Sequence, residues 1–325
     1  MENLDNRWPE LPYEALRPTL TTLHLWSQIV GKIRLAKTPW VNHSWHVTLY
    51  VSARGLTTGL IPQDGGGFEL EFDFISHAMI VRVCDGGEER IALGPRSVAS
   101  FYSELLEKLT DLESPVQIDT HPNELPAVIP FPEDMAPRAY EPEAAHRFWH
   151  ALVQCDRIFR AFRTGFLGKV SPVHFFWGSF DLAVTRFSGR RAPLHPGGVP
   201  HLPDAVVQEA YSHEVSSAGF WPGDDNTRYA AFYSYSYPTP ARFAEAAVLP
   251  KEAYFDSKLG EFLLPYEAVR RAQDSDSALL SFLQSTYDAA AEAGHWDRAA
   301  LDIAQGQVGK PWPISDAAVE TKRDE

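Results

Sequence analysis

The sequence contains little cysteine and no long hydrophobic run. Its two cysteines, Cys84 and Cys155, lie far apart in a chain of 325 residues and lack metal-type spacing, so neither a disulfide framework nor a cysteine zinc site is predicted. No apolar stretch approaches the roughly 18 residues of a membrane span. The N-terminal MENLDNRWPELPY has neither the basic start nor the apolar core of a signal peptide. We therefore expect a cytoplasmic protein without a membrane partner.

Basic residues are also scarce relative to acidic ones. The chain has 29 lysines and arginines against 43 aspartates and glutamates, a formal net charge of −14. This balance argues against broad binding to phosphate backbones or anionic lipid, so we expect no nucleic-acid partner. Hydrophobic residues make up 44% and charged residues 22% of the chain, which is the composition of an ordinary globular protein.

Several catalytic signatures are missing. There is no HExxH, H-x-H or facial-triad spacing, so the metal signal is weak and the identity of any metal or cofactor stays unknown. No G-x-G-x-x-G or P-loop occurs, and the glycine clusters are read as turns. WGSFD, around Ser179, lacks the second glycine of a nucleophile elbow, which makes a serine hydrolase a weak hypothesis.

Hydrophobic periodicity and prolines divide the chain into five parts. Apolar residues at helical spacing predict helices over 19–37, 97–109, 143–163 and 277–293. Alternating segments predict strands over 45–54, 68–83, 116–119, 173–187, 209–220, 229–237 and 261–266. Prolines cluster between Pro115 and Pro142, where they interrupt any regular element. The predicted parts are an N-terminal arm (1–18), a first half (19–120), a proline-rich linker (121–142), a second half (143–310) and a polar C-terminal tail (311–325).

The two halves contain matching strings in the same order. HLWSQIVGKIRLAKT aligns with HALVQCDRIFRAFRT, WHVTLYVSAR with WGSFDLAVTR, and DFISH with EAYSH. This order indicates an internal duplication. We therefore predict an α+β fold of two pseudo-repeated helix–antiparallel sheet–helix halves that pack around a shared interface, where concave sites commonly form.

The stretch VHFFWGSFDLAVTRFSGRR, residues 173–191, is the most informative part of the chain. It combines aromatics, one carboxylate and several arginines, and its β-branched and aromatic composition predicts a strand. On a regular strand His174 and Asp181 would point to opposite faces, whereas a bulge at Gly178–Ser179 would bring them to one face. The alternative is structural: Asp181 caps a turn or pairs with an arginine, and His174 is an interior histidine.

Other candidate residues lie on neighbouring predicted strands. An acid precedes a histidine by four residues in each half, at Asp73–His77 and Glu209–His213, with Glu214 directly after the second pair. Arg54 and Arg186 end matching strings and could clamp an anion through two hydrogen bonds, or form salt bridges. Aromatic residues could stack on a flat ligand or simply fill the core. These aromatic residues are Trp177, Tyr211, Phe220, Trp221, Tyr233, Tyr235 and Tyr237.

The strings also resemble a known family. LHLWSQIVGKIRLA, HVTLYVSARGLTT, SPVHFFWGSFDLAVTRFSGR, EAYSHEVSSAGFWPG and LGEFLLPY are similar to a family of uncharacterised bacterial proteins, classed as a domain of unknown function. The resemblance covers nearly the whole chain. It implies a bacterial source and a single full-length unit, and it implies no activity.

Two functional hypotheses follow from these residues. The first is an enzyme, acid–base or metal-assisted and possibly hydrolytic, that acts on a small polar or anionic substrate in a pocket of the second half. Its catalytic groups would be His174, Asp181, His213 and Glu214, and its substrate-binding groups Arg186, Trp177, Tyr211 and Arg54. The alternative is a non-catalytic small-molecule binding or sensor module that uses the same pocket. A third hypothesis is an interaction protein with an acidic surface.

Overall fold

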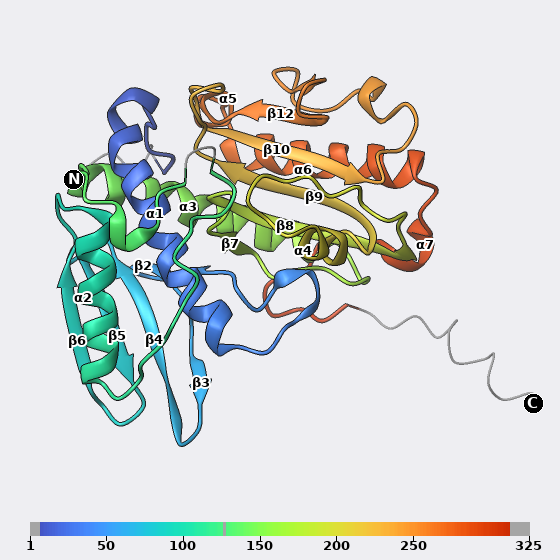
Figure 1. Ribbon diagram of the computed structural model, residues 1–325. Coiled ribbons are helices and arrows are strands. Elements are labelled where there is room, and N and C mark those ends of the chain that lie inside the picture. The colour runs from blue at the N-terminus through green and yellow to red at the C-terminus, as the bar shows by residue number, and fades with distance from the viewer. Residues whose placement is uncertain (1–6, 126–127, 313–325) are drawn as a thin grey trace, which may run out of the picture.

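The computed structural model describes residues 7–125 and 128–312 (Figure 1). Residues 1–6 of the predicted arm and 313–325 of the predicted tail lie outside the described residues. The described chain forms a mixed α and β structure with two antiparallel sheets of six strands each. This architecture confirms the predicted fold class. The domain boundaries and the duplication itself stay predictions.

The described helices include the four that periodicity predicts. Ser97 caps α2 by accepting the Ser100 amide at 3.1 Å, and Asp274 caps α6 by accepting the Ser277 amide at 3.0 Å. Pro142 occupies the first turn of α3, where its missing N–H costs nothing. The α-helices are α1 (Tyr13–Lys37), α2 (Val98–Asp111), α3 (Pro142–Arg163), α4 (Asp204–Ala210), α5 (Tyr266–Arg270), α6 (Ser275–Ala293) and α7 (Arg298–Leu301), and the 3-10 turns are η1 (Asn42–Ser44), η2 (Phe131–Glu133) and η3 (Phe243–Glu245).

The predicted start of the first helix is wrong. α1 begins at Tyr13 and contains Pro18, which the sequence reading assigned to an extended arm. Pro18 lies on the exposed side near the start of the helix. The backbone carbonyl four residues earlier, at Glu14, is therefore free to bind water in place of the lost amide.

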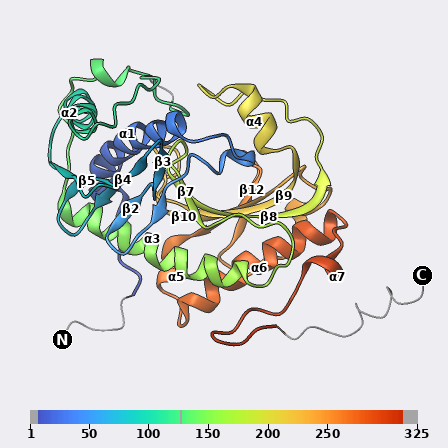
Figure 2. The ribbon, with the colours of Figure 1, turned by 90° about the horizontal axis from the view of Figure 1, so that it is seen from below.

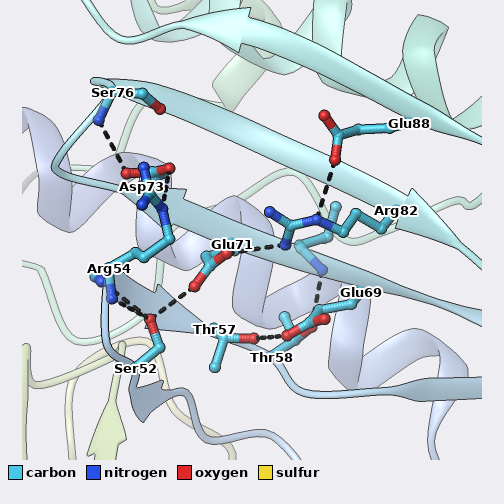
Figure 3. Close-up of polar contacts among 12 residues, drawn as sticks. Ser52, Arg54, Thr57, Thr58, Glu69, Glu71, Asp73, Ser76, Arg82 and Glu88 are labelled. Carbon is cyan, nitrogen blue, oxygen red and sulfur yellow. Dashed lines mark hydrogen bonds and ion pairs between the residues drawn. The ribbon is translucent and has the colours of Figure 1, made fainter.

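The first sheet has the order β1-β2-β4-β5-β6, with β3 paired to β4. Its strands are β1 (Tyr50–Val51), β2 (Gly55–Thr57), β3 (Ile61–Gln63), β4 (Gly66–Asp73), β5 (Ala78–Val83) and β6 (Glu88–Ala92). The turn between β5 and β6 falls at Asp85–Gly87, as the sequence predicts. The polar side chains of this sheet form a network of ion pairs and hydrogen bonds, seen in Figure 3.

The second sheet has the order β11-β12-β10-β9-β8-β7. Its strands are β7 (His174–Phe176), β8 (Asp181–Arg191), β9 (His213–Trp221), β10 (Ala231–Tyr237), β11 (Tyr254–Asp256) and β12 (Glu261–Pro265). Figure 2 shows α3 and α6 along one face of this sheet, whereas α4 lies over the opposite face. The two faces of the sheet therefore have different coverings.

Five predicted strands differ from the structure. Residues 68–83 form the β4–β5 hairpin rather than one strand. Residues 45–48 form no strand, because their polar groups hydrogen-bond to the end of α1; Thr38, for example, donates to the His46 carbonyl at 3.2 Å. Residues 116–119 are irregular. The segment 209–220 is divided between α4 and β9, so Glu209 and His213 do not share a strand face. Residues 173–187 form the β7–β8 hairpin rather than one strand.

The two sheets meet at their edges. Leu49, just before β1, exchanges two backbone hydrogen bonds with Phe175 of β7, at 2.9 and 2.7 Å. Buried apolar side chains from both halves form one continuous hydrophobic cluster. The sheets are therefore held together by both backbone pairing and a shared core.

Candidate functional site

A cavity of about 800 Å³ lies on the face of the second sheet that α4 covers. Alternation along β8 explains this position: Asp181, Ala183 and Thr185 line the cavity, while Arg186 points to α3 and α6. Ser217 of β9, Tyr233 and Tyr235 of β10, and Glu261 of β12 complete the floor.

Both halves of the chain form the walls of this cavity. The first half contributes the end of α1 and the segment that follows it, and the proline-rich region contributes residues 117–124. The α4 helix and the loop before it form the remaining wall. Aromatic wall residues include Trp40 and Trp45 after α1, Tyr211 at the end of α4, Trp177 in the β7–β8 turn and Trp221 at the end of β9. The cavity thus lies at the interface between the halves, where the sequence predicts a concave site.

Small residues on the floor allow Tyr233 to reach Asp181. The register places Tyr233 opposite Gly219, and Gly219 opposite Ala183, so Tyr233 extends across β9. A Cβ atom at Gly219 would lie 2.3 Å from the Tyr233 hydroxyl oxygen, which leaves room for glycine only. The Tyr233 hydroxyl donates a hydrogen bond to Asp181 Oδ2. The carboxyl of Asp181 is therefore fixed in orientation at the bottom of the cavity.

A row of hydroxyl groups lies beside this pair. The Tyr235 hydroxyl contacts that of Tyr211, from the end of α4, at 2.9 Å. The Thr185 and Ser217 hydroxyls contact each other at 2.8 Å. Each of these hydroxyls both donates and accepts, so the floor offers several hydrogen-bonding groups to a ligand.

The turn between β7 and β8 forms another part of the wall. Trp177 is buried and donates from its indole nitrogen to the Val47 carbonyl at 2.8 Å. Its ring packs directly on Gly31 of α1, where an added Cβ would lie 2.1 Å from the indole. In the same turn the Ser179 hydroxyl donates to Glu124 at 2.6 Å. These contacts hold α1, the β7–β8 hairpin and the proline-rich region together at the cavity wall.

Three carboxyl groups of the cavity have raised pKa values. Burial raises the pKa of Asp181 to about 7, opposed by the Tyr233 hydrogen bond and reinforced by Glu124. Burial, with Asp181 and Asp256 nearby, raises the pKa of Glu261 to about 7. Burial also raises the pKa of Glu124. Near neutral pH Asp181 and Glu261 therefore exchange protons readily, which is the property required of an acid–base catalyst.

A histidine-centred cluster fixes the wall between α1 and α4. The backbone amide of His43 donates to Glu209 at 2.8 and 3.1 Å, and its Nδ1 donates to the Ala210 carbonyl at 2.8 Å. Because Nδ1 must carry the proton, Nε2 accepts from the Lys169 ammonium at 2.7 Å. Glu209 thus holds the turn at His43, which has a positive φ of 61°.

Comparison with known proteins identifies a family. The model of a family of unknown function, DUF5996, matches residues 8–303. The chain belongs to this family. Neither a search of curated proteins nor one of solved structures finds a match to this DUF5996 protein. Within residues 7–125 and 128–312, no helix combines the length and apolar character that a membrane crossing requires.

Three of the predicted site residues line the cavity of the DUF5996 protein. They are Asp181, Trp177 and Tyr211. The β7–β8 turn also places His174 on the same sheet face as Asp181, because His174 pairs with Ala183. His174 nevertheless has no exposed surface, since it packs against Trp45 and Phe176, which line the cavity in its place.

The four remaining predicted residues lie elsewhere, so the structure does not bring the whole set together. Arg186 is buried between the rings of Phe162 and Tyr287 on the helical face of the sheet. His213 lies beside Ser212 and does not line the cavity. Glu214 accepts from Arg190 at 2.6 Å.

Arg54 is the fourth residue outside the cavity. It pairs with Asp73 at 2.6 Å in the first sheet, as Figure 3 shows. The expectation that these residues share one hollow with Asp181 is therefore wrong. Their side chains are already occupied by partners within the fold.

Sequence reasoning missed the other two carboxyl groups of the DUF5996 cavity whose pKa values are raised, Glu261 and Glu124. Glu261 is the lone acid of an apolar strand, EFLLP, which is a usable signal for a functional acid. Glu124 comes from the proline-rich segment, where no periodicity indicates which way a side chain points. In the described parts of the chain, no group of three or more His, Cys, Asp or Glu is arranged to hold a metal ion.

Proposed function

We propose that this protein is an enzyme that binds a small organic molecule in the cavity and transfers a proton to or from it. Asp181 is the acid–base group in this proposal. The observation that supports it is a buried carboxyl that faces an 800 Å³ cavity and is oriented by the Tyr233 hydroxyl. Cavities of this size, with aromatic walls and a few convergent polar groups, accommodate drug-sized ligands.

The protonation state of Asp181 supports this role. With a pKa of about 7, its carboxyl is present in both forms at neutral pH and can donate or accept a proton. Tyr233 stabilises the ionised form through its hydrogen bond, whereas burial and Glu124 stabilise the neutral form. The carboxyl is only 6% exposed, and burial of this kind strengthens electrostatic interactions with a bound ligand.

The alternative function is non-catalytic binding in the same cavity. It is favoured by the lining, which is mainly apolar and aromatic and whose polar groups are already partly paired with each other. A sensor or carrier would bind ligands without changing them.

One experiment separates the two functions. A library of metabolite-like compounds is screened by thermal shift, and compounds that stabilise the protein are incubated with it and analysed for products by mass spectrometry. Replacement Asp181→Asn should reduce turnover at saturating ligand by about 10²–10⁴-fold, the usual contribution of a positioned acid–base group, while the variant remains folded. The rate in the wild type should depend on pH with an apparent pKa near 7.

The matched control is Asp111→Asn, at the exposed end of α2, which should leave turnover unchanged. Stabilising compounds that yield no product would favour the binding alternative. Wild-type turnover in the Asp181→Asn variant would contradict the assigned role of Asp181.

A further inference from the structure

The charges inside the cavity are unevenly distributed. Asp181, Glu124 and Glu261 line it, and none of them forms an ion pair with any described basic residue. A buried carboxylate without a cation is costly, and burial accordingly raises the pKa of all three groups. A cation placed among them would remove this cost and allow them to ionise.

Lys32 of α1 provides the opposite charge on another wall. Its side chain is only 4% exposed and lines the cavity, and its ammonium is 3.6 Å from Asp119 Oδ2. An ammonium has three donors, and this ion pair uses at most one of them. No other described group forms an ion pair or a hydrogen bond with the Lys32 ammonium, whereas Asp119 is also engaged by His121 at 3.0 Å. Lys32 therefore has donors available for an acceptor group on a ligand.

The aromatic walls suit a ligand with a positive charge. The ammonium of Lys169 lies 5.0 Å from the Trp45 ring centroid, and that of Lys32 lies 6.0 Å from the Trp177 centroid. These contacts are the geometry in which a ring face attracts a cation. Two of the protein's own lysines therefore already lie close to these rings. Other aromatic side chains that line the cavity remain for a positively charged group of the ligand.

We propose that the ligand is a bipolar amine: a molecule with a protonated amine for the three carboxyl groups, an apolar or aromatic body, and a carboxylate or carbonyl for Lys32. This inference deepens the proposed function, because it assumes that the same cavity is the binding site. Of the small polar or anionic substrates expected from the sequence, it keeps the polar class and replaces the purely anionic one, since the floor of the cavity is acidic and the predicted arginines lie outside it.

Binding of such a ligand should release a proton. At pH 6 the carboxyl of Asp181 is mostly protonated and must ionise to pair with the amine. The titratable groups around the Asp181 carboxyl are Glu124, Glu261 and Tyr233. Tyr235, Tyr211 and Lys32 also line the cavity. The affinity should therefore increase by about tenfold from pH 6 to pH 8.

Two sets of matched probes test the inference by calorimetry. The aromatic set is 4-(2-aminoethyl)benzoate, 2-phenylethylamine and 3-phenylpropionate, and the aliphatic set is 8-aminooctanoate, octylamine and octanoate. In at least one set the bipolar amine should bind most tightly, the simple amine at least tenfold more weakly, and the acid not measurably. The bipolar amine should also show the increase in affinity between pH 6 and pH 8.

Three variants test which side chains bind the amine and which binds the carboxylate of the probe. Asp181→Asn should reduce the pH dependence and weaken both amines, and Glu261→Gln should weaken both amines. Lys32→Met should weaken the bipolar amine at least tenfold and leave the simple amine unchanged, which shows that the variant is folded. Asp111→Asn is the control and should alter neither.

The outcomes separate this inference from the proposed function. Tighter binding of the acids, equal binding of all three probes, or failure of every amine in both sets would overturn the bipolar ligand. Binding of the bipolar amine without turnover of any amine substrate would leave this inference intact and contradict the enzymatic proposal instead.

Discussion

At the scale of single residues, burial decides the chemistry of each titratable group. Asp181 and His174 are seven positions apart on the same hairpin and face the same side of the sheet. Asp181 faces the cavity and accepts a hydrogen bond from Tyr233. Burial raises its pKa to about 7, and the hydrogen bond opposes this rise. His174 has no hydrogen-bond partner in the described chain, and burial together with Arg34 and Arg163 lowers its pKa to about 3.

Replacement of His174 by phenylalanine should raise stability at acidic pH. The unfolded state binds a proton at His174 below about pH 6.5 while the folded state does not, so the free energy of unfolding falls as the pH decreases from about 6.5 towards 3. The free energy of unfolding of the variant, relative to that of the wild type, should be about 2 kcal/mol higher at pH 5 than at pH 8. Urea unfolding at the two pH values measures this difference. An equal difference at both pH values would contradict a neutral, buried His174.

At the scale of elements, two short features convert ordinary strands into a site. The turn between β7 and β8 places Trp177 and Ser179 at the cavity wall and returns the chain at Asp181. Gly219, in the middle of β9, leaves the space through which Tyr233 crosses to the next strand. The turn divides the predicted strand and brings His174 and Asp181 to one face, whereas Gly219 leaves no mark on a hydrophobic pattern, so periodicity predicts strands here without indicating the site.

Replacement Gly219→Ala should disrupt the Tyr233–Asp181 pair. The added Cβ would lie 2.3 Å from the Tyr233 hydroxyl oxygen and 2.6 Å from the Leu182 carbonyl oxygen, so both the side chain and the strand must shift. Overpacking of this kind costs about 1–3 kcal/mol, which denaturant unfolding measures. Without the hydrogen bond from Tyr233, the pKa of Asp181 should rise further.

The matched control for this variant is Gly94→Ala, where an added Cβ meets no atom within 4 Å. Its stability should change by less than about 0.5 kcal/mol. If Gly219→Ala were as stable as Gly94→Ala, the close contact between Gly219 and Tyr233 would not hold in solution.

At the scale of the whole molecule, the cavity depends on segments that are distant in the sequence. Gln28 of α1 is fully buried and binds both backbone groups of Asn123, donating to its carbonyl at 2.8 Å and accepting from its amide at 2.7 Å. The Asn123 side chain in turn donates to the His201 carbonyl in the loop before α4. One buried amide therefore positions the segment that carries Glu124 against the rest of the wall.

Replacement Gln28→Leu should release this segment. Two backbone groups of Asn123 would lose their partners, at a cost of about 1–3 kcal/mol for each group left buried and unpaired. Limited proteolysis should then cleave faster between residues 115 and 125, and ligand affinity should fall because Glu124 is no longer fixed. Gln273→Leu, at an exposed position without a hydrogen-bond partner in the described chain, is the control. Unchanged proteolysis in the Gln28→Leu variant would contradict this anchoring role.

The sequence alone determined the local elements and part of the site. Helical periodicity predicted three of the long helices to within two residues, because short-range hydrogen bonds and one buried stripe define them. The alternation of Tyr233, Tyr235 and Tyr237 placed a tyrosine row on one sheet face, and two of the three line the cavity. Asp181, Trp177 and Tyr211 were selected for their chemistry and also line it.

The tertiary structure decided which polar side chains remain available to a ligand. Arg186, Arg54 and Glu214 carry suitable chemistry, but aromatic rings, Asp73 and Arg190 occupy them. Glu124 and Lys32 belong to different segments and become neighbours of one cavity only after the two halves pack together. The physical reason is that burial and pairing depend on contacts between residues far apart in the chain, which no local pattern encodes.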